Sequence, residues 1–203
     1  MKSISLRLRA FFAILAIVFA FTQQWNTAVA KDDPKSGFIA EVLGQLDYVK
    51  GQIVSLEGAI PQDKFTWRPT EGVRSHSELY LHIADGLYIF ANSGGLKSPY
   101  DDKTLFDEKT RDVRTTDKAK VAAELNTAFD WTKSAVAKVT NADLEKTVVF
   151  FGRKQTLRNL LITMLNHTHE HLGQAIAYAR SNGVVPPWTA KQQEAMKKKD
   201  EKK

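Results

Sequence analysis

Four stretches of the sequence place apolar residues at the three- and four-residue steps of an amphipathic helix, and this pattern constrains the fold most strongly. They lie between Pro34 and Pro61, from Ser75 to near Gly94-Gly95, from near Thr116-Asp117 to Val136, and from Leu157 to about Asn182. Helices of this length, each with one apolar face, bury those faces against one another. We therefore predict an all-α protein built as a four-helix bundle.

Capping residues support these boundaries. Ser75 and Glu78 have the spacing of a capping box, which opens the second helix. Thr156 can cap the fourth helix, and Gly183 is a typical stop signal. Of the connections, 147–151 is β-prone and predicts one short extended segment before Gly152, whereas 96–115 is long and charged and forms either a crossover loop or a flap.

The first thirty residues have the layout of a secretory signal peptide. A positive start (Lys2, Arg7, Arg9) precedes an apolar run, and Ala28-Val29-Ala30 gives the small-x-small pattern of a cleavage site. The apolar run is too short for a comfortable membrane span, although an uncleaved anchor is the alternative. The chain has no Cys, which excludes a lipoprotein. We expect an exported protein, periplasmic or secreted, whose mature chain begins at Lys31 and has no stable membrane span.

The formal net charge of +6 is concentrated at the two ends of the chain. Residues 1–30 contribute three positive charges, and the Lys-rich residues 189–203 contribute a net three more. The intervening domain, 31–188, is therefore close to neutral and lacks the basic face that nucleic-acid binding requires. We expect no nucleic-acid partner and interpret residues 189–203 as a solvated, poorly ordered tail.

Three histidines fall on the inward faces of two predicted helices. At about 100° per residue, His167 and His171 lie on the apolar stripe of the fourth helix, one turn apart. His82 lies on the stripe of the second helix, whereas His169 projects about 140° away from its own stripe. His76 sits in a first turn that we expect to open to water.

Neutral imidazoles suit Zn²⁺, Ni²⁺, Cu²⁺ or Fe²⁺, and three protein ligands leave one position open. We therefore predict a divalent-metal site at His82, His167 and His171; the alternative is that each is a hydrogen-bonded core histidine. The segment His167-Thr-His-Glu-His171 also fits the inverted zinc-protease motif. That class requires an acidic ligand downstream, and the only candidates lie in the Lys-rich tail, so we do not favour it.

The combination of several short motifs resembles the DinB/YfiT-like family. The motifs are Trp67-Arg68-Pro69, Leu81-His82-Ile83-Ala84-Asp85, His167-x3-His171-x-Gly173-Gln174, Arg180-x2-Gly183 and Pro186-Pro187. The resemblance runs in order from about Phe38 to Pro187 and implies a four-helix bundle with His82, His167 and His171 as metal ligands. Two departures, at Glu170 and Leu172, where many members have His and Arg, bear on substrate contacts rather than on the ligands.

The resemblance implies a small-molecule substrate, since members of the family are thiol transferases or hydrolases. Small bacterial thiols are cytosolic, so export favours metal-dependent hydrolysis; thiol transfer and a non-catalytic metal-binding bundle are the alternatives. Asp85 and Glu170 flank the ligand faces and are candidates for orienting a ligand or moving a proton, unless they are plain surface carboxylates. We expect Gln174, one turn beyond His171, to contact substrate, and a homodimer is compatible with the sequence.

Overall fold

The computed structural model describes residues 37–107 and 111–201. The predicted signal segment, 1–30, lies outside the described residues, so export stays a prediction. Of the helices within the described part of the chain, none is long and apolar enough to cross a membrane.

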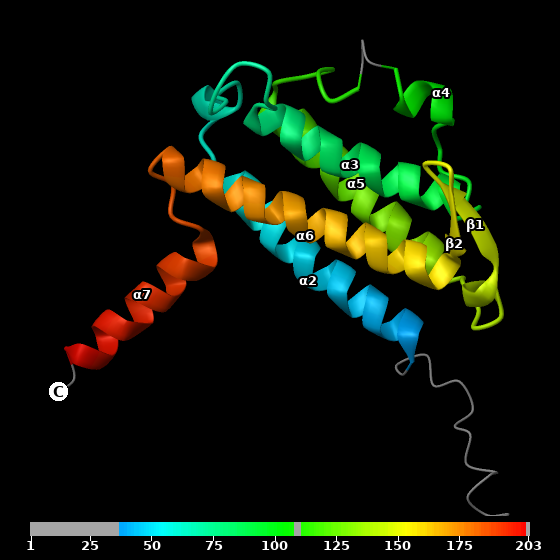
Figure 1. Cartoon of the computed structure of the whole chain (residues 1–203). Helices are drawn as coiled ribbons and strands as arrows, with labels where there is room; N and C mark the ends of the chain where they lie inside the picture. The colour runs from blue at the N-terminus through cyan, green and yellow to red at the C-terminus, as the bar shows by residue number, and fades with distance from the viewer. Residues whose placement is uncertain (1–36, 108–110, 202–203) are drawn as a thin grey trace, which may run out of the picture. The chain divides into compact units, whose positions relative to one another are not determined.

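The four predicted long helices are present and lie against one another (Figure 1). They are α2 (Phe38–Ala59), α3 (His76–Ser93), α5 (Lys118–Val136) and α6 (Leu157–Ser181). Helices α2 and α3 each pack against both α5 and α6. These contacts close a ring in the order α2, α5, α3, α6, so the consecutive helices α2 and α3 occupy opposite corners of the bundle. The predicted four-helix bundle is confirmed.

The helix caps are those the sequence predicts. The Glu78 backbone N–H donates to Ser75 Oγ at 3.4 Å, and the Ser75 N–H donates to Glu78 Oε2 at 2.7 Å, which completes the capping box. Thr156 Oγ1 accepts from Asn159 N at 3.2 Å at the start of α6. Each cap satisfies backbone donors that the first turn of a helix leaves unpaired.

Helix α3 is the central element of the core. Every residue from Leu79 to Ala91 is buried, because α5 and α6 cover two sides and a polar connection covers a third. A helix buried on all sides tolerates few charges, and Asp85 is the one carboxylate in this run. A side chain that projects from this run therefore meets another part of the protein on every face.

The connection between α2 and α3 folds back over the start of α3. It contains the short 3-10 helix η1 (Gln62–Lys64) and Trp67, whose carbonyl accepts from His76 N at 3.2 Å. His76 is fully buried, with ring contacts to Trp67, Tyr80 and Tyr178. The expectation that this first turn opens to water is wrong, because Trp67 covers it.

The long connection between α3 and α5 is a crossover segment. It carries the one-turn helix α4 (Asp102–Leu105), which contacts α3. A 3-10 turn, η2 (Asp143–Glu145), follows α5. The segment predicted as one extended strand is in fact the first half of an antiparallel hairpin, β1 (Thr147–Phe150) and β2 (Arg153–Thr156), in which Phe150 pairs with Arg153.

The hairpin turn explains why the second strand was missed. Phe151 and Gly152 both have positive φ, 45° and 76°, as the two central residues of a type I′ turn require. Asn-Gly or Asp-Gly is the usual sequence signal for such a turn. Phe is an unusual residue at this position, so the sequence gives no turn signal there.

The Lys-rich tail differs from the expectation of a poorly ordered end. Residues Pro187–Asp200 form helix α7, with Pro187 at its first turn, where proline is favoured. Its Ala, Lys, Gln, Glu and Met residues are strong helix formers. The residues from 191 to 200 are exposed, so the predicted solvation is correct and the predicted lack of order over this stretch is not.

Candidate metal centre

The three predicted ligands meet inside the bundle. His82 projects from α3, and His167 and His171 project from one face of α6. His167 Nε2 lies 3.3 Å from His82 Nε2 and 3.2 Å from His171 Nε2. His82 and His171 are buried, with 8% and 9% of their surface exposed. The predicted helical phases therefore bring these imidazoles together, and their ligand atoms all lie within 4.8 Å of one another.

The spacing fits a single divalent cation. Nitrogen ligands at about 2.05 Å in tetrahedral geometry lie about 3.3 Å apart, close to the two distances observed. Burial lowers the pKa of His167 to about 3, with smaller contributions from His171 and His82, and burial also lowers the pKa of His171. Neutral imidazoles keep the lone pairs that bind a metal. A buried group of three imidazole nitrogen donors is therefore a site that can hold a metal ion.

A glycine makes room for the middle histidine, His167. A Cβ built on Gly86 of α3 would lie 2.7 Å from His167 Cε1 and 3.3 Å from its Nδ1. Such a contact is shorter than van der Waals packing allows, so any larger residue would displace the His167 ring. Helical phase alone does not show which side chain faces Gly86, so its role appears only in the structure.

Gln174 orients His171. Its Oε1 accepts a hydrogen bond from His171 Nδ1 at 2.9 Å, while its Nε2 donates to Tyr178 Oη at 2.8 Å. With its proton on Nδ1, His171 presents a lone pair at Nε2, toward His82 and His167. Fixing the tautomer of a ligand in this way is a common role of the residues behind a metal site. Contact of Gln174 with substrate stays a prediction.

Asp112 lies next to Nδ1 of His82, as Gln174 lies next to Nδ1 of His171. Its Oδ2 lies 3.4 Å from His82 Nδ1 and accepts from Arg74 Nε at 2.8 Å. Burial alone would raise the pKa of this carboxyl, but its interactions with His82 and Arg74 outweigh burial and lower the pKa. Asp112 also has a positive φ of 63°, which Asp tolerates better than most residues. Sequence reasoning missed Asp112 because it lies in a connection without helical periodicity.

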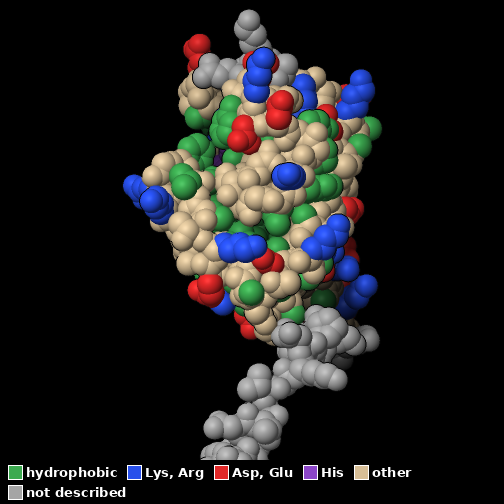
Figure 2. All heavy atoms as spheres, turned by 90° about the vertical axis from the view of Figure 1, so that its right-hand side faces the viewer, with side chains coloured by type: hydrophobic (Ala, Val, Ile, Leu, Met, Phe, Trp, Pro, Cys, Tyr) green, Lys and Arg blue, Asp and Glu red, His purple; other side chains and the backbone are tan. Residues whose placement is uncertain are grey.

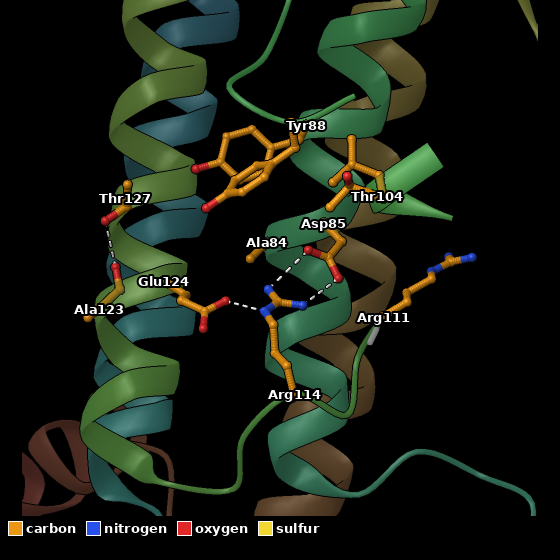
Figure 3. Close-up of a pocket in the computed structure, with 11 residues that line it drawn as sticks. Ala84, Asp85, Tyr88, Thr104, Arg111, Arg114, Ala123, Glu124 and Thr127 are labelled. Carbon is orange, nitrogen blue, oxygen red and sulfur yellow. Dashed lines mark hydrogen bonds and ion pairs between the residues drawn. The ribbon is translucent and has the colours of Figure 1, made fainter. Parts of the chain in front are cut away.

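Asp85 takes no part in the histidine cluster. Both of its oxygens accept from Arg114, at 2.8 and 3.0 Å, and Arg114 Nε also pairs with Glu124 of α5 (Figure 3). This ion-pair group borders a separate cavity of about 520 Å³ that Tyr88 and Tyr100 also line. The structure thus places Asp85 in a link between α3, α5 and the crossover segment.

Glu170 and His169 lie on the outer part of α6. Glu170 is exposed and borders a cavity of about 390 Å³ that reaches His82 and His167. His169 Nδ1 lies 2.9 Å from the Leu165 carbonyl, and His169 is outside the three-histidine group, as its helical phase predicts. Figure 2 views the hairpin side of the molecule, where a histidine side chain is visible in a hollow between hydrophobic ones.

These features define a class: four-helix-bundle proteins with a buried three-histidine site near one end of a small cavity. The DinB superfamily model matches residues 45–175, most of the described bundle. The chain belongs to the DinB superfamily. The resemblance seen in the sequence motifs is therefore confirmed.

Individual proteins are similar to this chain in sequence or in structure. An uncharacterized protein of Bacillus subtilis strain 168, YjoA, is 30% identical over 129 residues, which cover 61% of this chain and 77% of YjoA. A DinB-like protein from Bacillus cereus ATCC 10987 superposes with a TM-score of 0.61 at 21% identity, covering 72% of this chain and 93% of that one.

A third similar structure is YfiT from Bacillus subtilis, described as a probable metal-dependent hydrolase with an unusual four-helix bundle topology. It superposes with a TM-score of 0.56 at 18% identity and covers 78% of this chain and 93% of YfiT. At this identity, the likeness shows the shared fold.

Proposed function

We propose that the protein is an exported, metal-dependent hydrolase of a small-molecule ester, amide or lactone. The observation that carries the proposal is the convergence of His82, His167 and His171 at 3.2–3.3 Å beside a cavity that substrate can enter. The description of YfiT as a probable metal-dependent hydrolase supports the same reading. The metal identity, Zn²⁺, Ni²⁺, Cu²⁺ or Fe²⁺, is left open by a set of three imidazoles.

A divalent cation at three imidazoles acidifies water and polarises a carbonyl oxygen. The chain supplies the rest. His82, His167 and His171 hold the cation. The hydrogen bond from His171 to Gln174 fixes the orientation of that ring, and the Asp112 carboxylate lies 3.4 Å from His82 Nδ1. Among the residues that line the 390 Å³ cavity, Glu170 is the carboxylate, so we assign it the transfer of a proton from water to the leaving group. Water adds to the carbonyl carbon, the bond to the leaving oxygen or nitrogen breaks, and the leaving group takes the proton.

The N-terminal segment favours hydrolysis over thiol transfer, which is the second candidate function. Small thiols are kept reduced in the cytosol and not in an oxidising exterior, whereas water is available in both. Export, inferred from residues 1–30, therefore favours hydrolysis. The third candidate, a non-catalytic metal-binding bundle, has the same histidine geometry but needs no cavity beside it.

The test is a parallel screen of the metal-loaded mature protein. Ester, amide and lactone panels are assayed beside thiol conjugation to electrophiles, with His171→Ala as the inactive control. Hydrolysis that disappears in His171→Ala supports the proposal. Conjugation that disappears in the same variant, without hydrolysis, supports thiol transfer, and inactivity in both assays supports the non-catalytic bundle.

A further inference from the structure

The turn of the β1–β2 hairpin carries an exposed aromatic side chain at a strained position. Phe151 is 73% exposed and has a φ of 45°. A bulky side chain in this region of backbone conformation is strained. Asn, Asp or Gly would form the same turn without this strain. The Phe151 ring therefore has no evident role in the stability of the turn.

The ring of Phe151 is the outer end of a row of aromatic contacts that leads to a metal ligand. Its centroid lies 4.5 Å from that of Phe150, which stacks on Phe90 at 4.6 Å. Phe90 in turn meets the His167 ring edge-on at 5.3 Å. The hairpin and α3 thus form one continuous aromatic wall from the solvent to the candidate metal centre.

This wall borders the cavity at the metal centre. Phe90, Phe150 and Phe151 line the 390 Å³ cavity together with His82 and His167. A volume of this size is near the lower end of small-molecule sites, which are mostly apolar with a few polar groups that fix the ligand. The polar groups here, besides the two histidines, are Arg111, Thr163, Asn166 and Glu170. The apolar side of the cavity therefore consists of the three phenyl rings and Ile89.

Phe106, at the end of α4, contacts the outer ring of this wall from a separate segment. Its ring lies 6.1 Å from that of Phe151, and the Arg111 guanidinium lies 5.6 Å from its centroid. Phe106 is itself 38% exposed. Aromatic rings from two separate segments, the hairpin and the crossover, therefore meet edge to face, and that of Phe151 lines the cavity.

We propose that this aromatic wall binds a flat apolar group of the substrate, an aryl group, with the bond to be cleaved beside His82 and His167. The inference rests on the proposed metal-dependent hydrolysis and specifies its substrate class: compact aryl esters, amides or lactones. Aryl groups fit because stacked and edge-on ring pairs at these centroid distances are favourable beyond simple burial. Phe151 is then a substrate-binding residue whose strain is retained for that contact.

The test uses two metal-binding probes that differ only in the group placed against the wall. Benzohydroxamic acid and acetohydroxamic acid share the same metal-binding head, and their dissociation constants are measured with the metal-loaded mature protein by calorimetry. We expect benzohydroxamic acid to bind about tenfold more tightly or better. In Phe151→Asn the advantage should fall to about threefold or less, while acetohydroxamic acid binds as in the wild type.

Val149→Thr is the matched control. Val149 lies on the same hairpin, is 54% exposed and does not line the cavity, so its substitution should leave both dissociation constants unchanged. Phe151→Asn should also keep or raise the thermal stability, since Asn accepts a positive φ. A marked loss of stability in Phe151→Asn would make the ring structural and overturn the inference.

The remaining outcomes distinguish a failure of the aryl-binding inference from a failure of the proposed metal-dependent hydrolysis. A protein that binds metal and acetohydroxamic acid, but gains nothing from the phenyl group, overturns the inference and leaves the proposed function standing. A protein that binds no metal overturns both. If Phe151→Asn instead changes the oligomeric state by size-exclusion chromatography and leaves both affinities unchanged, the exposed ring contacts a second copy of the chain, and the inference is wrong.

Discussion

Gly86 of α3 faces the imidazole of His167 so closely that a Cβ at residue 86 would lie 2.7 Å from His167 Cε1. Glycine in a helix interior is destabilising by roughly 1 kcal/mol relative to alanine. The absence of a side chain at Gly86 therefore has a cost to helix stability, and the benefit is the position of His167 between His82 and His171.

Gly86→Ala should weaken metal binding by about tenfold or more, because His167 must turn or shift away from the other two ligands. Metal titration with a competing chelator measures this affinity. Gly173→Ala is the matched control on α6, where a new Cβ meets nothing within 4 Å. It should keep the affinity and raise stability by up to about 1 kcal/mol. Equal affinities in the two variants would contradict the claim that the metal site requires a residue without a side chain at Gly86.

Gln174 should act through His171. Gln174→Leu removes the acceptor for His171 Nδ1–H, and we expect metal affinity to fall about 10- to 100-fold. Gln174→Glu retains an oxygen acceptor and should retain most of the affinity. Loss of affinity in both variants, or in neither, would contradict the assignment of Gln174 as the residue that positions His171.

Glu57, remote in sequence from the histidines, should make stability depend on pH. It is 2% exposed, and Oε1 has no hydrogen-bond partner within the described residues. Burial raises its pKa to about 7, partly offset by Lys118. The pKa of Glu57 is higher in the folded state than in the unfolded state. Its contribution to stability is therefore fully present below about pH 4.5 and is lost as pH rises through 7.

The wild type should therefore lose up to about 3 kcal/mol of unfolding free energy between pH 5 and pH 8, relative to Glu57→Gln. Urea unfolding at several pH values measures the difference, which cancels groups that titrate in both proteins. Parallel pH profiles for the two proteins would mean that Glu57 ionises normally in the folded state.

The N-terminal prediction is tested on protein from the native host. If residues 1–30 are a signal peptide, N-terminal sequencing should find Lys31 as the first residue of the exported protein. An intact Met1 in a cytosolic fraction would contradict export and would remove the main argument for hydrolysis over thiol transfer.

Helical phase made the histidine centre predictable. His82, His167 and His171 are placed by a fixed rotation per residue on helices whose caps, such as Ser75 and Thr156, are legible in the sequence. The same rotation set His169 apart. Periodicity and capping were thus sufficient for the bundle and for the three imidazoles.

Two supporting groups, Asp112 and Arg114, could not be predicted because they lie outside periodic segments. Asp112 and Arg114 come from the crossover connection, which has no repeating pattern from which to derive a direction. Arg114 forms an ion pair with Asp85, so this carboxylate, predicted to orient a ligand or move a proton, is paired away from the histidines. The turn at Phe151 was hidden because its residue type contradicts its backbone conformation.

The central claim is tested most directly by metal analysis of the mature protein, purified without a histidine tag and loaded with a divalent ion. We predict one bound ion per chain, and loss of most of it in His82→Ala, His167→Ala and His171→Ala alike, since two imidazoles hold a divalent ion poorly. His169→Ala, on the same helix, should retain the full stoichiometry. A metal-free wild type, or a His169→Ala variant that loses metal as completely as His171→Ala, would contradict the account.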